Sequence, residues 1–307
     1  MLERIHARGV RALSGDEIVE FGKLYRRVSS DLAYATGHHF EQAIQHYLNR
    51  LTARAHAHVY SATSENGAQR LLSFFAEVFP REFRRSWKYV ALCAALTVCS
   101  GLIAFSTVSM RPITAYALLP EPVIPARIQR SLHDSNFAFN PDQSAMMSAQ
   151  IITNNIRVAI IAFAGGMTLG AVTLFVILFN GILIGVMGGL FTNAGFGYDF
   201  WATVAPHGVL ELTAIQIAGS AGFLLAAGVL HPGRFRRRDA LRENGRRAGV
   251  LILGVAAMLL VAGTIEGFFS PLKFDASVRI EVGVVTAAGL IAYFGFAGLH
   301  AKVSLAP

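Results

Sequence analysis

The sequence contains few charged residues. Asp, Glu, Lys and Arg make up 15% of its 307 residues, whereas 53% are hydrophobic. A typical soluble domain carries about 25% charged residues. So large an apolar content excludes a disordered chain and argues against an ordinary soluble enzyme. The two cysteines are too few for a disulfide-stapled secreted domain. The composition therefore predicts an integral membrane protein with a polar cap, and its net charge of +8 suits Lys and Arg residues that face the anionic side of a membrane.

Long runs without charge begin after Lys88. A membrane-spanning helix needs about 20 predominantly apolar residues. By this criterion we expect five full spans and one short span, 181–196. Together they are 89–110, 158–179, 181–196, 209–230, 248–265 and 282–299. The start of the chain has no apolar core before a small-residue cleavage site, so the first span is expected to act as the insertion signal.

The distribution of basic residues predicts the orientation of the spans. Arginines and a lysine precede the first span, and seven arginines follow the fourth, whereas the intervening loop 111–155 is neutral. Basic loops lie in the cytoplasm, and both basic segments do so only if 181–196 crosses the membrane. We therefore expect six spans with both termini cytoplasmic, and a tight turn at Asn180-Gly181 between spans two and three. A re-entrant half-helix over 181–196 is the alternative.

Residues 1–86 are expected to form a cytoplasmic helical cap, followed by a transmembrane domain over 87–307. Apolar residues three and four apart predict helices over 15–35 and 39–60. A third, aromatic-rich helix over 69–79 is expected to end at Pro80 and to lie in the membrane interface. The fold class is thus an all-α polytopic helix bundle with an N-terminal helical cap.

Histidines are concentrated in the cap. Metal binding and solvated side chains on a polar face are the two interpretations, and the absence of cysteine or a carboxylate triad near them favours the second. Those between residues 38 and 58 are His38, His39, His46, His56 and His58.

A few polar residues fall inside the predicted spans, where ionisable groups are costly and mark functional sites by default. His207 and Glu211 are four residues apart and share a helix face, with Pro206 expected at the helix start. A hydrogen bond between them could couple to protons. Glu266 lies at the outer end of span five. The segment Asn154, Asn155 and Arg157 starts span two, so Arg157 is expected to pair with Glu211 or Glu266. The cluster either locks the bundle or serves transport or catalysis.

Glycines recur at a spacing of four within the spans. The pairs are Gly166/Gly170, Gly181/Gly185 and Gly185/Gly189. Such small-xxx-small pairs let helices approach closely. They predict tight packing and are compatible with oligomerisation.

Several segments resemble one family over residues 18–300. They are LYRRVSSDLAYA, YLNRLTARAHAHVY, FPREFRR, NNIRVAIIAFAGG, FNGILIG, PHGVLELTAIQIAGSAGF and GTIEGFFSP, in that order. The chain resembles the stage II sporulation protein M family of bacterial integral membrane proteins. The resemblance makes His207, Gly208, Glu211, Glu266, Gly267 and Pro271 the motif positions. It implies a multi-span scaffold or transporter-like protein. Founding members act in a membrane complex that drives peptidoglycan remodelling during engulfment. The long cap is typical of relatives in non-sporulating bacteria, which accompany MoxR-type ATPases and von Willebrand-type domain proteins.

Three functions are compatible with these features. The first is a non-enzymatic scaffold of a cell-envelope complex in the bacterial cytoplasmic (inner) membrane. The second is a transporter or channel with the His/Glu cluster as its ion or substrate site. The third, an intramembrane enzyme, has only His207, Glu211 and Glu266 to supply its chemistry. We expect the lipid bilayer and other envelope membrane proteins as partners, and leave a homo-oligomer open. No cofactor, metal or nucleic acid is expected.

Overall fold

The computed structural model describes residues 2, 4–5, 13–38, 40–61, 67–119, 141–269, 272 and 274–299. These residues form helices and their connections, without strands, which confirms the all-α class for the described chain. The chain divides into two compact units, Met1–Leu72 and Ser73–Pro307. The predicted boundary at residue 86 therefore lies too late, because residues 73–86 pack with the membrane helices.

The first unit is a helical hairpin of α2 (Gly15–Gly37) and α3 (Gln42–Ser61), followed by the start of α4 (Gly67–Ser73). Helix α2 begins with a capping box: Glu17 N–H donates to Ser14 Oγ, and Ser14 N–H donates to Glu17 Oε2. Phe21 of α2 and Ala55 of α3 are buried together. The Tyr25 hydroxyl is 2.8 Å from His56 Nδ1 and adds a polar contact between the two helices.

A helical segment leads from the cap to the membrane helices. Helix α4 continues through a π-helical turn, η2 (Phe74–Val78), into α5 (Phe79–Arg85). The expected end at Pro80 is wrong, because Pro80 stands in the first turn of α5 and the helical segment continues past it to Arg85. The aromatic residues of this segment pack against α12 (Arg237–Phe269) and α13 (Ala276–Phe296). The Phe79 ring meets the Phe294 ring edge to face, with the ring centroids 5.5 Å apart.

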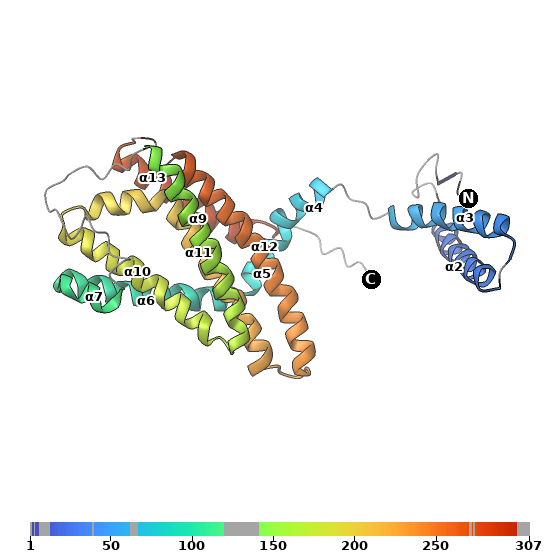
Figure 1. Cartoon of the computed structure of the whole chain (residues 1–307), viewed down its shortest axis with the longest axis horizontal. Coiled ribbons are helices and arrows are strands. Elements are labelled where there is room, and N and C mark those ends of the chain that lie inside the picture. The colour runs from blue at the N-terminus through green and yellow to red at the C-terminus, as the bar shows by residue number, and fades with distance from the viewer. Residues whose placement is uncertain are drawn as a thin grey trace. The chain divides into compact units, whose positions relative to one another are not determined.

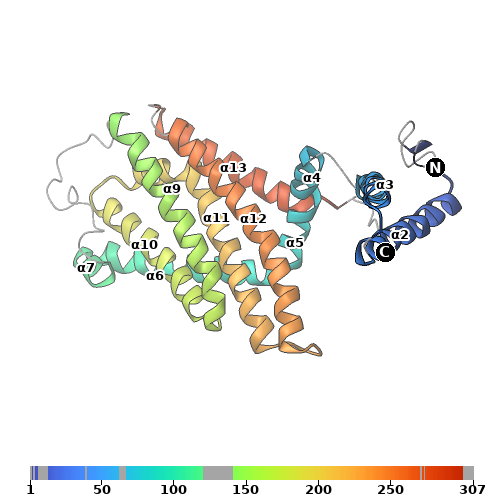
Figure 2. The ribbon, with the colours of Figure 1, turned by 45° about the vertical axis from the view of Figure 1, so that its right-hand side comes forward.

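Six long helices build the described part of the second unit. They are α6 (Trp87–Met110), α9 (Pro141–Ala164), α10 (Ala171–Asn193), α11 (Gly197–Leu230), α12 (Arg237–Phe269) and α13 (Ala276–Phe296), with a short α7 (Ala115–Leu118) after α6. Five of them are long and apolar enough to cross a membrane: α6, α10, α11, α12 and α13. Helix α9 runs beside α11 and α12 (Figures 1 and 2). The polytopic bundle is therefore confirmed.

The turn between the second and third long helices differs from the prediction. Helix α9 ends at Ala164, and the chain reverses through a 3-10 turn over Gly165–Thr168. Leu169 and Gly170 follow with φ of 56° and 87°, the left-handed conformation that glycine adopts readily. Asn180 and Gly181 lie inside α10, so the turn expected there, the span bounds 158–179 and 181–196, and the re-entrant alternative are wrong. With 23 residues, α10 is about 34 Å long.

Other helix ends also differ from the predicted spans. Helix α9 begins at Pro141, so the predicted outer loop 111–155 is largely helical in its second part. Pro206 lies inside α11 instead of starting it. Helices α11 and α12 contain the predicted spans 209–230 and 248–265 within 34 and 33 residues, and α13 ends at Phe296 instead of residue 299. At such lengths α11 and α12 are each about 50 Å long, well over the ~30 Å hydrocarbon core of a bilayer.

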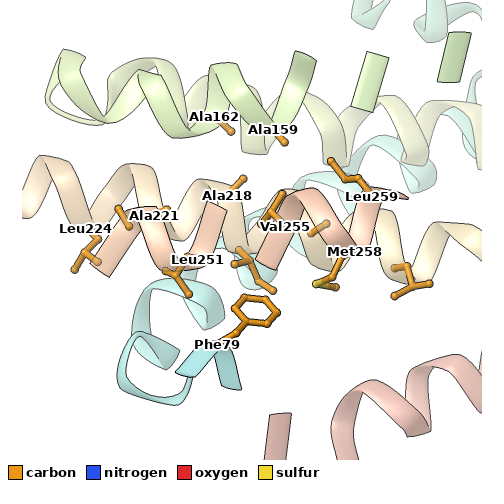
Figure 3. Close-up of a cluster of buried hydrophobic side chains, with 14 of the residues drawn as sticks. Phe79, Ala159, Ala162, Ala218, Ala221, Leu224, Leu251, Val255, Met258 and Leu259 are labelled. Carbon is orange, nitrogen blue, oxygen red and sulfur yellow. The ribbon is translucent and has the colours of Figure 1, made fainter. Parts of the chain in front are cut away.

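The core of the second unit lies between α9, α11, α12 and α5. Small residues on α9 and α11 face larger ones on α12, and Phe79 inserts from α5 (Figure 3). The labelled side chains are Phe79, Ala159, Ala162, Ala218, Ala221, Leu224, Leu251, Val255, Met258 and Leu259.

Glycines allow two pairs of helices to touch through their backbones. A Cβ on Gly185 of α10 would lie 2.1 Å from the carbonyl oxygen of Gly101 in α6. A Cβ on Gly166 would lie 2.2 Å from the carbonyl oxygen of Gly222 in α11. The predicted close packing is present, but it operates within one chain. These glycines therefore give no support to an oligomer interface.

Candidate functional site

The bundle interior holds three buried ionisable side chains. His207 and Glu211 come from α11 and Glu266 from α12, and each is at most 8% exposed. The side chain of Asn155, on α9, lies close enough to Glu211 to interact with its carboxyl group. Glu211 is also close enough to Glu266 for its charge to act on that carboxyl group. Three neighbouring helices thus contribute to one polar cluster, which we define as Asn155, His207, Glu211 and Glu266.

Two atoms of this cluster have no hydrogen-bond partner in the described part of the chain. His207 Nδ1 and Glu266 Oε2 are buried, and neither forms a hydrogen bond with a described residue. The described contacts also include no hydrogen bond between His207 and Glu211, so the coupling expected from their spacing is not formed. A buried polar atom without a partner costs free energy. Such atoms are expected where a ligand, an ion or a water molecule completes the site.

Pro206 adds a further polar group next to His207. Proline has no N–H, so the carbonyl of Ala202, one turn earlier in α11, lacks its usual helical donor. Pro206 and Ala202 are both buried. A free carbonyl at membrane depth is tolerated where it is enclosed by protein or lines a polar site.

The remaining polar residues of the predicted cluster lie elsewhere. Asn154 and Arg157 are exposed on α9, and among the described residues Arg157 forms no ion pair with Glu211 or Glu266. The predicted pairing is therefore wrong. Arg157 follows Asn155 by two residues, about 200° around the helix. Asn155 faces α11, so Arg157 points away from it.

The glycine and proline positions that the family resemblance singles out differ in their surroundings. Gly208 is buried in α11, and a Cβ there would lie 2.6 Å from the Val204 side chain on the preceding turn. A Cβ on Gly267 would meet nothing within 4 Å, so packing does not require glycine there. Pro271 lies outside the described residues.

The described residues of the cluster and of the cap do not assemble a metal site. Within the described part of the chain, no group of three or more His, Cys, Asp or Glu side chains could hold a metal ion. His38 Nδ1 lies 3.0 Å from the carbonyl oxygen of Tyr34, and His56 contacts Tyr25. His39 lies outside the described residues, as does the side chain of His58.

A second polar network, which the sequence did not predict, lies at the other end of the bundle. Arg247 of α12 donates from Nε to Glu82 Oε1 of α5 at 2.6 Å, and from Nη2 to Ser86 Oγ at 3.1 Å. Both ion-paired side chains are largely buried, at 15% and 12% exposed. Nearby, Arg84 donates to the carbonyl oxygen of Phe294 at 2.8 Å. Glu82 is the one acidic residue in the basic segment PREFRRSWK. A single acid among basic residues was the sequence feature that could have indicated this ion pair.

Comparison with known proteins identifies relatives of both units. Residues 90–271 match the family described as Stage II sporulation protein M. Residues 1–61 match a domain of unknown function, DUF8413. The uncharacterized protein MJ0793 of Methanocaldococcus jannaschii is 30% identical over 123 residues, which cover 39% of this chain and 69% of that protein. No solved structure matches the chain.

Proposed function

Because this chain belongs to the stage II sporulation protein M family, we propose that it is a non-enzymatic scaffold that anchors a cell-envelope complex in the bacterial cytoplasmic membrane. In this proposal the membrane helices hold the protein in the bilayer. The cap binds a protein partner on the cytoplasmic side.

The observation that carries the proposal is an exposed aromatic surface on the cap. Tyr34 and Tyr47 are each 59% exposed, and Phe40 and Ile44 are nearly half exposed. Tyr34 and Phe40 meet edge to face, with centroids 6.0 Å apart, where α2 leads into α3. We call these four residues the aromatic tip. Tyrosine side chains in a cluster are typical of the residues that dominate protein–protein binding.

The membrane unit has the properties of an anchor. The α6–α10 and α9–α11 contacts are backbone to backbone at glycines, which favours a rigid bundle. The Glu82–Arg247 ion pair joins the segment after the cap to α12. A load on the cap would therefore reach the bundle through α5.

Charge supports cytoplasmic placement of the cap. The Glu82–Arg247 contact brings together the two basic segments that precede α6 and follow α11. Arg84 bonds to the last turn of α13 at the same end. If the positive-inside rule holds for these segments, that end and both termini face the cytoplasm.

The proposal is tested by altering the aromatic tip in the full-length protein. Tyr34→Ser and Tyr47→Ser together should remove a partner that co-purifies reproducibly from native membranes. Val19→Ser is the matched control, since Val19 is also 59% exposed on α2 but lies outside the tip. Equal recovery of every co-purifying protein from all three forms would contradict the proposal.

A second function is favoured by the unpartnered atoms of the polar cluster. Buried carboxylates and a histidine inside a bundle are typical of proton or cation pathways. If the protein is a transporter, Glu266→Gln should abolish ion-dependent flux in proteoliposomes, while Asn154→Asp on the exposed side of α9 should not. Equal flux in empty and protein-containing vesicles across pH and Na⁺ gradients would exclude this alternative for those ions.

A further inference from the structure

A surface cavity of about 380 Å³ lies at the basic end of the membrane unit. Apolar side chains form one wall, with Leu92 from α6, Leu169 from the α9–α10 turn, and Phe223 and Leu230 from α11. Polar side chains form the other, with His231, Asn244 and Arg247. One cavity thus joins an apolar surface to the start of α12.

The cavity lies beside two hairpins whose tips extend to different distances along the bundle. Both hairpins, α9–α10 and α11–α12, end at the same end of the bundle (Figures 1 and 2). The tip of the first lies level with Ala226, because a Cβ on Gly170 would contact Ala226 and Phe223 at 3.3 and 3.2 Å. Helix α11 continues for another turn to Leu230 before the chain enters α12. The cavity occupies the step between them.

The tip of the α9–α10 hairpin, which is the shorter of the two, is suited to lipid and not to water. No charged residue occurs between Val158 and Tyr198. At the tip Met167 and Leu169 are 67% and 55% exposed, and the Thr168 hydroxyl bonds to the carbonyl oxygen of Gly165 at 2.7 Å. The apolar wall of the cavity therefore lies at the depth of acyl chains.

The tip of the α11–α12 hairpin, which extends further, carries strong positive charge. Residues 231–247 contain seven arginines against Asp239 and Glu243, a net charge of +5. His231, Asn244 and Arg247 of this segment line the cavity, and Arg234 and Arg236 follow His231 in the connection to α12. Basic pockets between membrane helices on the cytoplasmic side bind anionic lipid headgroups. The polar wall lies where such a headgroup would be.

We propose that this cavity binds an anionic phospholipid of the adjacent leaflet. One acyl chain would lie against Leu92, Leu169 and Phe223. The phosphate would face the segment 231–247. The inference rests on the membrane insertion of the bundle and is independent of the scaffold and transport functions.

Native mass spectrometry of the purified, delipidated full-length protein tests this site. Phosphatidylglycerol, titrated as the anionic lipid, should bind at one site, and phosphatidylcholine should bind much more weakly. Neutralising Arg234 and Arg236, in the exposed connection that follows His231, to Gln should weaken phosphatidylglycerol binding about fivefold for each arginine. The matched control is Arg50→Gln with Arg54→Gln in the cap, which should leave binding unchanged.

Filling the cavity separates a built site from general surface attraction. Ala227→Phe places a ring in the cavity that Ala227 lines and should abolish the bound lipid. Ala288→Phe, at an exposed alanine of α13, should not. If Ala227→Phe fails to fold, Leu92→Trp narrows the cavity from a half-exposed position. Unchanged binding in the filled protein, equal binding of phosphatidylcholine, or displacement of the lipid by inorganic phosphate alone would overturn the proposal.

Discussion

The ring of Phe79 occupies the space that a side chain at position 254 would need. A Cβ on Gly254 would lie 2.1 Å from the Phe79 ring, well inside van der Waals contact. Phe79 is 1% exposed and is held by Phe74, Phe75 and Phe294, so the ring cannot move aside. This contact fixes α5 against the middle of α12 and thereby joins the segment after the cap to the membrane bundle.

Gly254→Ala is expected to destabilise the protein by about 1–3 kcal/mol, the usual cost of overpacking. The measurement is unfolding in mixed micelles followed by circular dichroism. Gly249→Ala on the same helix is the control. A Cβ there meets nothing within 4 Å, and alanine is the better helix former, so stability should be unchanged or higher. Equal effects at the two positions would contradict the packing of Phe79 on α12.

The Glu82–Arg247 ion pair is expected to stabilise the junction between α5 and α12. Removing one partner leaves a largely buried charge unpaired, so Glu82→Gln should cost about 3 kcal/mol. A double-mutant cycle with Arg247→Gln should show strong coupling, since the two side chains share one network. The control cycle uses Arg85 and Glu243, which lie 3.8 Å apart and are more than half exposed. Its coupling should be under about 1 kcal/mol, and equal coupling in both cycles would count against the account.

Gly185 should be indispensable to the α6–α10 contact. Gly185→Ala forces α10 away from the Gly101 carbonyl oxygen, and we expect a loss of about 1–3 kcal/mol in stability and a lower monodisperse fraction after purification. Gly289→Ala on α13, where a Cβ meets nothing within 4 Å, should behave like the unaltered protein. A fully monodisperse and equally stable Gly185→Ala protein would show that the two helices are further apart than described.

The start of α2 should loosen in acid. The Ser14 backbone N–H and the Arg4 side chain both donate to the Glu17 carboxylate and hold its pKa below the usual 4.5. A lowered folded pKa gives stability that is fully present above pH 4.5 and lost as pH falls through the folded pKa. Hydrogen exchange of the first turn of α2, corrected for intrinsic rates, should therefore rise below that pH. Glu17→Gln should remove this dependence, and a persistent dependence in that variant would assign it to another group.

Hydropathy and charge predicted the class of fold because they record which residues face lipid and which face water. The predicted spans 89–110, 209–230 and 248–265 lie within α6, α11 and α12, and the basic segments around Arg84 and Arg247 do meet at one end of the bundle. Both results follow from the free energy of placing charge in a membrane, which depends little on neighbouring residues.

The turn between α9 and α10 could not be located in this way. The sequence is apolar from Val158 to Tyr198 except for small polar residues, so hydropathy changes little where the chain reverses. The structure turns at Gly165–Gly170, where Leu169 and Gly170 have positive φ. Asn180, the more polar signal, bonds to the Val176 carbonyl oxygen within α10. A turn in lipid need not be polar if its backbone bonds are made internally.

The polar cluster was predicted in part. Helix spacing placed His207 and Glu211 on one face, and Glu266 and Asn155 do lie near them. The expected pairing of Arg157 is wrong because Arg157 lies about 200° around α9 from Asn155. Opposite charge alone does not show which side of a helix a residue occupies. Glu82 and Arg247 were missed because their contact joins residues 165 positions apart, and nothing local in the sequence reports such a distance.

In the proposed function, the aromatic tip of the cap contacts a protein partner on the cytoplasmic side of the membrane. A photo-crosslinking amino acid at Tyr47 of the full-length protein, expressed in its native cells, tests it most directly, with the same amino acid at Val19 as the control. We predict one reproducible crosslinked protein from position 47, absent from position 19 and lost when Tyr34 is also changed to Ser. Crosslinks only to lipid, or the same products from both positions, would contradict the claim.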